Sequence, residues 1–245
     1  MRIFLLSHAD DNSIYPLYKK ERNYLLNVLR LKVGEVFTAK DERGKYYKAS
    51  LINEETLSLE ETEKPEETLL DSLSGYKKKL FPIEVFQCIC KGKKNEEIVR
   101  MLTEAGVERI TFVSSDFTQQ SNFTAHEVER LEKIRREAIQ QSGSETTITD
   151  FKVLPFKQAL ESSLYQTILL HQSLRDKTYS LRSALKEESA KFGLSIFIGS
   201  EGGFSEEECQ IAEEKGAFPV LLPTNILRAE TAGIFTVGAI LALTE

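Results

Sequence analysis

The sequence predicts an α/β protein of two domains: a small β-barrel at residues 1–72 and a larger, mostly parallel-sheet domain at residues 81–245. Three observations lead to this prediction. Short runs of alternating apolar and polar residues fill the first part, which is typical of antiparallel strands. In the second part, apolar runs alternate with amphipathic stretches, the rhythm of strand–helix–strand units. A polar stretch with a proline and a charge run separates the two, and we place a linker at residues 73–80.

The first part contains one predicted helix among its strands. IFLL near the start is a strand candidate, and KERNYLLNVLR places Leu25, Leu26 and Leu29 on one face of a short helix. EVFTAKD, KYYKASLI and TLSLEET alternate apolar and polar residues and are joined by hairpin-like turns. One short helix among several short antiparallel strands indicates a small barrel.

The second part alternates strands and helices to its end. The predicted strands are PIEVFQCIC, RITFV, QTILLHQ, LSIFIG and FPVLL. The predicted helices are NEEIVRMLTEAGV, HEVERLEKIRREAIQQS, SLRSALKEESAKF, SEEECQIAEEKG and the apolar AETAGIFTVGAILALTE. Helices between successive strands imply a mostly parallel sheet with helices on both faces.

Composition and charge narrow the class of protein. Hydrophobic residues make up 41% and charged residues 29% of the chain, as in soluble globular proteins. We expect neither a membrane helix nor a secretory signal, because no apolar run is long enough. Cys88, Cys90 and Cys209 form no CxxC pair, so we expect a reducing, cytoplasmic compartment and no structural zinc. The net charge of −6 argues against a nonspecific nucleic-acid coat protein, whereas local basic runs are compatible with a specific RNA enzyme.

The stretch IFIGSEGGFSEEE at residues 196–208 is a glycine-rich turn between a strand and a helix, a pattern that often binds phosphate. Ser205 and Glu208 form a predicted capping box, and Glu206 and Glu207 add charge at the helix start. Because these carboxylates would repel phosphate and the loop lacks the P-loop lysine, we predict no phosphate site. Two interpretations remain: main-chain recognition of a neutral or cationic ligand, or a tight turn without a ligand.

A second polar motif, LLPTNILRAETAGIFTVGAI, links the last strand to the final helix. Arg228, Glu230 and Thr231 open this helix, and they are either functional groups or a local charge pair. With LLHQ at residues 169–172, three loops follow the carboxyl ends of strands, where parallel sheets form ligand crevices. Small residues along the final helix predict burial of much of its surface, with one part facing a partner subunit.

The two motifs in this order resemble the paired signature of the small-subunit ribosomal RNA methyltransferase E family, which methylates a uridine N3 atom of 16S rRNA with S-adenosylmethionine. YLLNVLRLKVGE, LTEAGVERI and EAIQQSG extend the resemblance along the chain. It implies a PUA-like, RNA-binding barrel at residues 1–72 and a SPOUT-type domain at residues 81–245. That domain contains a trefoil knot, a rare exception to unthreaded connections. The resemblance also implies a homodimer that acts on 16S rRNA, within a small-subunit particle, without a metal and without a membrane.

The resemblance also implies the residues of the site. The S-adenosylmethionine pocket is formed by residues of three strand ends and the final helix: Leu170, His171, Ile198, Gly199, Glu201, Gly202, Leu222, Ile226, Leu227 and Thr231. We expect Arg228 to stabilise negative charge on the uracil and Glu230 to orient the base or to accept its N3 proton. Alternatively, Glu230 only holds Arg228 and solvent takes the proton. The basic residues expected to bind RNA are Arg22, Arg30, Lys32, Lys91, Lys93 and Lys94.

The sequence departs from the family pattern at several positions. Ser200 stands where proline is usual, Pro223 replaces a glycine and Asn225 an arginine. Basic residues are also expected at the positions of Met101, Phe117 and Ser144. Two alternatives therefore stay open. One is a noncatalytic RNA-binding or ribosome-assembly protein on the same fold, and the other is a SPOUT methyltransferase with another RNA target.

Overall fold

The computed structural model describes residues 3–7, 13–41, 43–63, 80–144, 147–172 and 177–244. The chain divides into two compact units, one of residues 1–78 with 140–143 and the other of residues 79–139 with 144–245. Of the predicted linker, all but Leu80 lies outside the described residues. Among the residues that are described, the structure has no helix with the length and apolar character needed to cross a membrane.

The first unit contains a five-stranded sheet in the order β1–β3–β4–β5–β2. Its strands are β1 (Ile3–Leu5), β2 (Ile14–Pro16), β3 (Val36–Lys40), β4 (Tyr46–Asn53) and β5 (Thr56–Thr62). β1 is parallel to β3, and the other neighbours are antiparallel. The predicted helix is α1 (Lys19–Asn23) followed by a π-helical turn, which buries Leu25 completely. Among the strands described here, β1 and β2 are the two edges of the sheet, so its closure into a PUA-like barrel stays a prediction.

The second unit is built on a six-stranded sheet in the order β11–β9–β10–β6–β7–β8, with every neighbouring pair parallel. The strands are β6 (Ile83–Cys88), β7 (Arg109–Ser114), β8 (Thr147–Pro155), β9 (Gln166–Leu170), β10 (Leu194–Ile198) and β11 (Phe218–Val220). The helices are α3 (Lys94–Ala105), α4 (Ala125–Ser142), α5 (Phe156–Glu161), α6 (Leu181–Ala184), α7 (Glu206–Glu214) and α8 (Ala229–Thr244). The predicted α/β class with a parallel sheet is therefore confirmed, whereas the trefoil knot stays a prediction.

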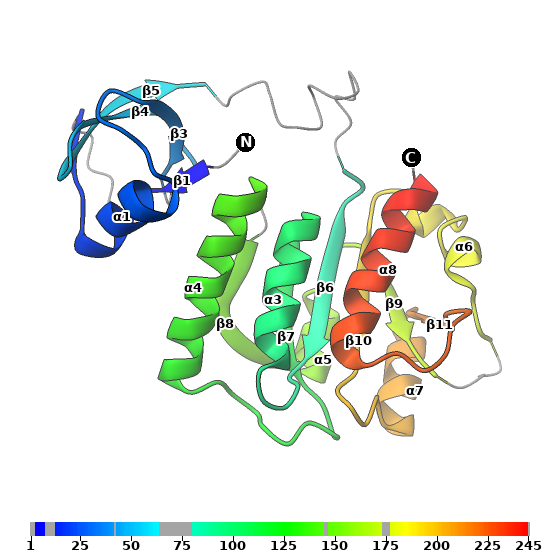
Figure 1. Cartoon of the computed structure of the whole chain (residues 1–245). Coiled ribbons are helices and arrows are strands. Elements are labelled where there is room, and N and C mark those ends of the chain that lie inside the picture. Colours follow the sequence, from blue (N-terminus) through cyan, green and yellow to red (C-terminus); the bar gives the residue numbers. More distant parts are fainter. Residues whose placement is uncertain are drawn as a thin grey trace. The chain divides into compact units, whose positions relative to one another are not determined.

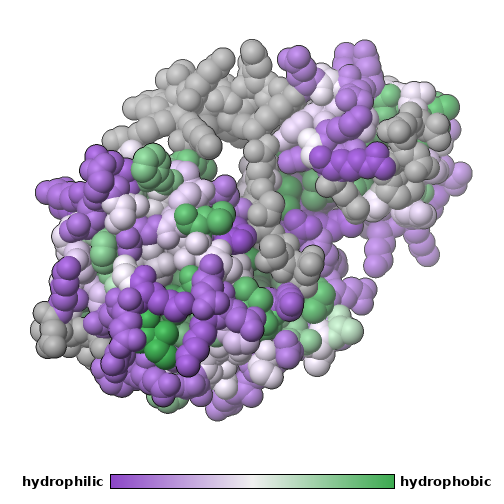
Figure 2. Space-filling view, turned by 180° about the vertical axis from the view of Figure 1, so that it is seen from behind, coloured by the Kyte–Doolittle hydropathy of each residue, from purple (hydrophilic) through white to green (hydrophobic). Residues whose placement is uncertain are grey.

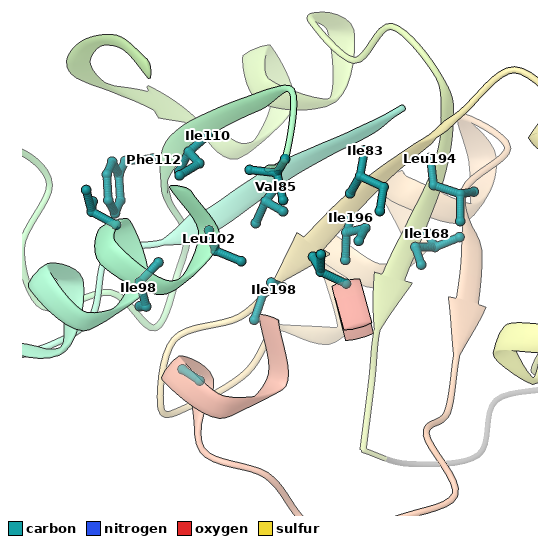
Figure 3. Packing of buried hydrophobic residues seen from close by; sticks show 14 of the residues in the cluster. Ile83, Val85, Ile98, Leu102, Ile110, Phe112, Ile168, Leu194, Ile196 and Ile198 are labelled. Atoms are coloured by element: carbon teal, nitrogen blue, oxygen red, sulfur yellow. The ribbon is translucent and has the colours of Figure 1, made fainter. Parts of the chain in front are cut away.

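Helices cover both faces of this sheet, with α3, α4 and α8 on one face and α5 and α7 on the other (Figure 1). Because side chains alternate along a strand, neighbouring residues enter different cores. Val85 and Ile196 join Leu102 of α3 in the first core, which Figure 3 shows between sheet and helix. Phe86 and Phe197 point to the other face, where their rings stack with centroids 4.4 Å apart. Each such side chain contributes roughly 1.5–3 kcal/mol by leaving water.

The last helix buries one side only. Gly233, Val237 and Ile240 of α8 are buried, and a Cβ on Gly233 would lie 3.1 Å from Ile198 Cδ1, so glycine allows close packing against the sheet. On its other side, Phe235 and Leu243 are exposed. Viewed from the side opposite to Figure 1, hydrophilic residues cover most of the described surface, with small hydrophobic patches between them (Figure 2). The predicted burial of this helix is thus correct for one face.

Two regions differ from the sequence prediction. β8 was not predicted, because Phe151 adopts a left-handed φ of 47° and the register against β7 shifts there, which interrupts the period-two pattern. The stretch SLRSALKEESAKF was predicted as one helix but forms α6 and a separate 3₁₀ turn at Glu188–Ala190. Glu187 between them is extended, with ψ at 142°, and this break allows both Ala184 and Ala190 to reach the core.

Candidate active site

A pocket of about 690 Å³ lies at the carboxyl ends of three neighbouring strands of the second unit, β11, β9 and β10. Its walls come from the loop after β9, the loop after β10 and the segment between β11 and α8. Parallel strands bring these loops to one edge of the sheet, as the sequence predicts. A pocket of this size is in the range of about 300–1,000 Å³ that binds small molecules.

The loop after β10 requires its glycines. Gly203 has a φ of +73°, and its N–H donates to the Ser200 carbonyl at 3.0 Å, which closes a tight turn. A Cβ on Gly199 would lie 2.7 Å from the Cα of Gly203, so the two glycines are in backbone contact. Residues without side chains at these points leave main-chain groups accessible to a ligand.

The turn ends in a capped helix. Ser205 Oγ accepts a hydrogen bond from Glu208 N at 3.2 Å, and Glu208 Oε2 accepts one from Ser205 N at 2.9 Å. The predicted capping box is thus confirmed. Burial raises the pKa of Glu208, although the backbone N–H groups of Ser205 and Asp116 donate to it. Ser205 Oγ therefore already occupies the Glu208 N–H, one of the donors that a phosphate at the start of α7 would need.

We expect Ser205→Ala to lower the free energy of unfolding by about 1 kcal/mol, since it removes the N-cap acceptor of α7. Urea denaturation of both proteins measures the difference. Ser189→Ala is the control, because this exposed serine lies in the 3₁₀ turn and its removal deletes no helix cap. An equal loss in the two variants would contradict the role of the cap.

Four charged side chains beside the pocket are linked by a series of ion pairs. Lys94 Nζ lies 2.6 Å from Glu201 Oε1 and 3.9 Å from Glu230 Oε2, and Arg228 Nη1 lies 4.0 Å from Glu230 Oε1. Burial would raise the pKa of Glu201, but the hydrogen bond from Lys94 and backbone N–H donors outweigh it and the pKa is lowered. The same bond raises the pKa of Lys94, so this pair is ionised at neutral pH.

Glu230 and Arg228 differ sharply in their surroundings. The Glu230 side chain is 10% exposed, whereas that of Arg228 is 82% exposed. Within the described part of the chain, Glu230 Oε2 is buried without a hydrogen-bond partner. A buried carboxylate oxygen without a hydrogen-bond donor is costly, and such groups concentrate at functional sites. Glu230 therefore has unused capacity to accept a hydrogen bond.

The structure brings most of the predicted cofactor residues together. All of them except Thr231 line the pocket: Leu170, His171, Ile198, Gly199, Glu201, Gly202, Leu222, Ile226 and Leu227. Thr231 is exposed on the first turn of α8 and is not part of the lining. Arg228 lines the pocket. Glu230 is not part of the lining, but its Oε2 lies 3.9 Å from Nζ of Lys94, which lines the pocket. Their functional roles stay predictions.

The predicted RNA-binding residues belong to both units of the chain. In the first unit, Arg22 pairs with Glu55 at 3.2 Å, while Arg30 and Lys32 are exposed. In the second unit, Lys91 and Lys93 are exposed at the start of α3. Their roles in RNA binding are untested.

Lys94, which we predicted to bind RNA, also lies in the pocket wall, a position that we did not predict, and its role in RNA binding is untested. The sequence nevertheless contains a feature that predicts Lys94 at the pocket. Lys94 begins α3 directly after β6, which lies between β10 and β7, so it also follows the carboxyl end of a central strand. We predicted RNA binding for Lys94 because it belongs to a basic run with Lys91 and Lys93.

Comparison with known proteins identifies similar sequences and folds. An RNA methyltransferase domain model matches residues 77–241. The chain is 29% identical to a ribosomal RNA small subunit methyltransferase E of Synechocystis over 91% of this chain and 71% of the relative. It is 28% identical to such a protein of Borreliella burgdorferi, over 91% of this chain and 88% of the relative.

Solved structures share the fold. A ribosomal RNA small subunit methyltransferase E from Neisseria gonorrhoeae, bound to S-adenosyl methionine, matches with a TM-score of 0.77 and 23% identity over 99% of this chain and 98% of that chain. A methyltransferase from Legionella pneumophila, in complex with the cofactor, matches with a TM-score of 0.77 and 20% identity over 98% and 96% of the two chains. These two structures show that the fold is shared, and the family model over residues 77–241 confirms the resemblance carried by the two C-terminal motifs.

Proposed function

Because the chain belongs to the RNA methyltransferase domain family, we propose that it transfers a methyl group from S-adenosylmethionine to the N3 atom of a uridine in 16S rRNA. The observation that carries this proposal is the pocket itself. Two motifs separated in sequence, GSEGGF and NILRA, line the same pocket of about 690 Å³ with the strand end at Leu170. The relatives from Synechocystis and Borreliella burgdorferi are named as methyltransferases of small-subunit rRNA, which supports the substrate.

The residues of the pocket fit the proposed cofactor. Leu170, Leu222 and Ile226 offer apolar surface for an adenine ring, while Gly199 and Gly202 offer accessible backbone groups. Glu201 adds negative charge, which is compatible with a cationic sulfonium. When bound, S-adenosylmethionine supplies an activated methyl group, and methyl transfer by displacement then depends on alignment of the acceptor.

The protein side of the reaction centres on Arg228 and Glu230. Uridine N3 carries a proton and is a poor nucleophile until that proton leaves. Glu230 orients the uracil or accepts this proton with Oε2, which has no hydrogen-bond partner among the described residues. Arg228, exposed at the pocket mouth, stabilises the negative charge that develops on the base.

The remaining expectations belong to the same proposal. The first unit is a PUA-like module that binds RNA through basic residues, and the second is a knotted SPOUT domain that forms a homodimer in the cytoplasm. The substrate is 16S rRNA within a small-subunit particle. Support comes from the resemblance, and the exposed Lys91 and Lys93 near the pocket provide cationic surface for a phosphate backbone.

Mass spectrometry of 16S rRNA nucleosides from a deletion strain tests the proposal. We expect N3-methyluridine to disappear and to return when the gene is restored. Calorimetry of the purified protein with S-adenosylmethionine separates the alternatives. Cofactor binding with unchanged N3-methyluridine would indicate another target, and absence of cofactor binding would indicate a noncatalytic RNA-binding protein.

We expect Gly199→Ala to weaken S-adenosylmethionine binding by about 5- to 150-fold, because the added methyl group forces apart two backbone segments of the pocket loop, and returning them to the binding geometry costs about 1–3 kcal/mol. A Cβ added at position 199 would lie only 2.7 Å from the Cα of Gly203. Calorimetric Kd values measure the effect. Gly238→Ala is the matched control, since a Cβ there meets nothing within 4 Å, and it should bind the cofactor as tightly as the parent. An unaffected Kd in Gly199→Ala would contradict a cofactor role for this loop.

A further inference from the structure

The loop between β7 and α4 presents an aromatic ring next to the pocket. Phe117 in this loop is 51% exposed, whereas Phe112, in the strand β7 that precedes the loop, is buried in the first core. An exposed phenylalanine forgoes roughly 1.5–3 kcal/mol that burial would contribute. Isolated exposed apolar residues are common, so the surroundings of this ring decide its meaning.

Phe117 packs directly on the pocket loop. A Cβ on Gly202 would lie 2.8 Å from Phe117 Cβ and 3.2 Å from its Cγ. Gly202 lines the pocket, while Phe117 lies just outside the residues that form its walls. Glycine at position 202 therefore allows the ring to lie against the backbone of the pocket rim, and half of the residue stays open to solvent.

Hydrogen bonds fix the loop that carries the ring. Ser200 Oγ donates to the Phe117 carbonyl at 3.3 Å, and Asp116 N donates to Glu208 Oε1 at 3.0 Å. Ser205 Oγ donates to Asp116 Oδ2 at 2.5 Å. Thr118 Oγ1 closes the turn by donating to the Ser115 carbonyl at 2.6 Å. The backbone that carries the ring is thus held in place before any ligand binds, which lowers the entropic cost of a contact with the ring.

From this position we infer that Phe117 is a base-stacking residue for the RNA strand, and that it binds the nucleotide next to the methylated uridine. The inference rests on the proposed function, because it requires an RNA substrate. A base that enters a pocket leaves its stack, and its neighbour loses a stacking partner. Proteins bind unstacked bases on exposed aromatic rings. Since Phe117 lies outside the pocket walls, it contacts the neighbouring base and leaves the pocket to the target.

A tryptophan at this position reports stacking directly. The chain contains no tryptophan, so Phe117→Trp introduces a unique fluorophore. We expect short single-stranded oligouridine to quench its fluorescence as a base stacks on the indole. Phe192→Trp is the control: Phe192 is 78% exposed but precedes β10, at the end of the sheet opposite to the pocket. The fluorescence of the Phe192→Trp variant should stay unchanged. Equal quenching of both variants would overturn the inference, and so would the absence of quenching in both.

Substitutions that keep or remove the ring provide the second measurement. We expect Phe117→Leu, which keeps apolar contact with Gly202, to weaken binding of unmethylated small subunits by about 5- to 150-fold, the effect of one lost base stack. Phe117→Tyr should bind as the parent does, and both variants should keep its affinity for S-adenosylmethionine. If Phe117→Leu binds as tightly as the parent, the stacking role is wrong. A parent protein that transfers no methyl group to any RNA would instead refute the proposed function.

Discussion

Replacement of Glu230 by Gln is expected to slow methyl transfer by a factor of about 10²–10⁴, the usual contribution of a general base. Glutamine has the same shape and keeps the packing of this buried residue, but it removes the charge and the ability to accept a proton. Oε2 of Glu230 is buried without a hydrogen-bond partner among the described residues, and it lies 3.9 Å from Lys94 Nζ. The loss would therefore reflect chemistry at this oxygen.

Single-turnover rates with saturating cofactor and unmethylated small subunits measure this effect. Glu207→Gln is the control, because Glu207 is an exposed carboxylate in the first turn of α7 and its removal changes the net charge equally. We expect that control to react at the parent rate. A full rate in Glu230→Gln would eliminate the general base, and Glu230 would then serve only to orient the uracil or to hold Arg228.

The sequence predicted the second unit well where a strand is fully buried. LSIFIG became β10, and its five residues are all buried, so the apolar run had no alternative structure. Parallel strands then place their carboxyl ends at one edge, and the neighbouring positions of β11, β9 and β10 bring the loops at Leu170, Gly199 and Leu222 together. The strand direction could be predicted from the alternation of strands and helices, whereas the strand order could not.

Other features depend on tertiary contacts that periodicity does not encode. The left-handed Phe151 interrupts the pattern of β8, and only pairing with β7 makes this segment a strand. The first residue of α3, Lys94, was assigned to RNA because neighbouring lysines formed a run, but its carboxylate partner lies more than a hundred residues away in sequence, at Glu201. The contact between Phe117 and Gly202 is likewise set by how two loops approach.

The buried ion pair at the other end of the sheet was also not predicted, and its disruption is expected to cost about 3–5 kcal/mol of unfolding free energy. Glu84 of β6 is 1% exposed, and its Oε1 lies 2.5 Å from Arg109 Nη2. Its other oxygen accepts hydrogen bonds from Ser195 Oγ at 2.8 Å and Leu164 N at 3.0 Å. Glu84→Ala would leave the Arg109 guanidinium, whose side chain is only 21% exposed, and two hydrogen-bond donors without their acceptor.

Urea denaturation tests this prediction against a surface pair. Arg100 and Glu104 form an i,i+4 ion pair at 3.3 Å with side chains 50% and 36% exposed, so Glu104→Ala should cost no more than about 1 kcal/mol. The double variant Glu84→Met with Arg109→Met should lose less than the sum of its single variants, because paired removal leaves no uncompensated charge. Equal losses in Glu84→Ala and Glu104→Ala would mean that water reaches the buried pair. The cost would then be small because the remaining guanidinium is solvated, and the amino end of the sheet would be less tightly closed than the 1% exposure of Glu84 indicates.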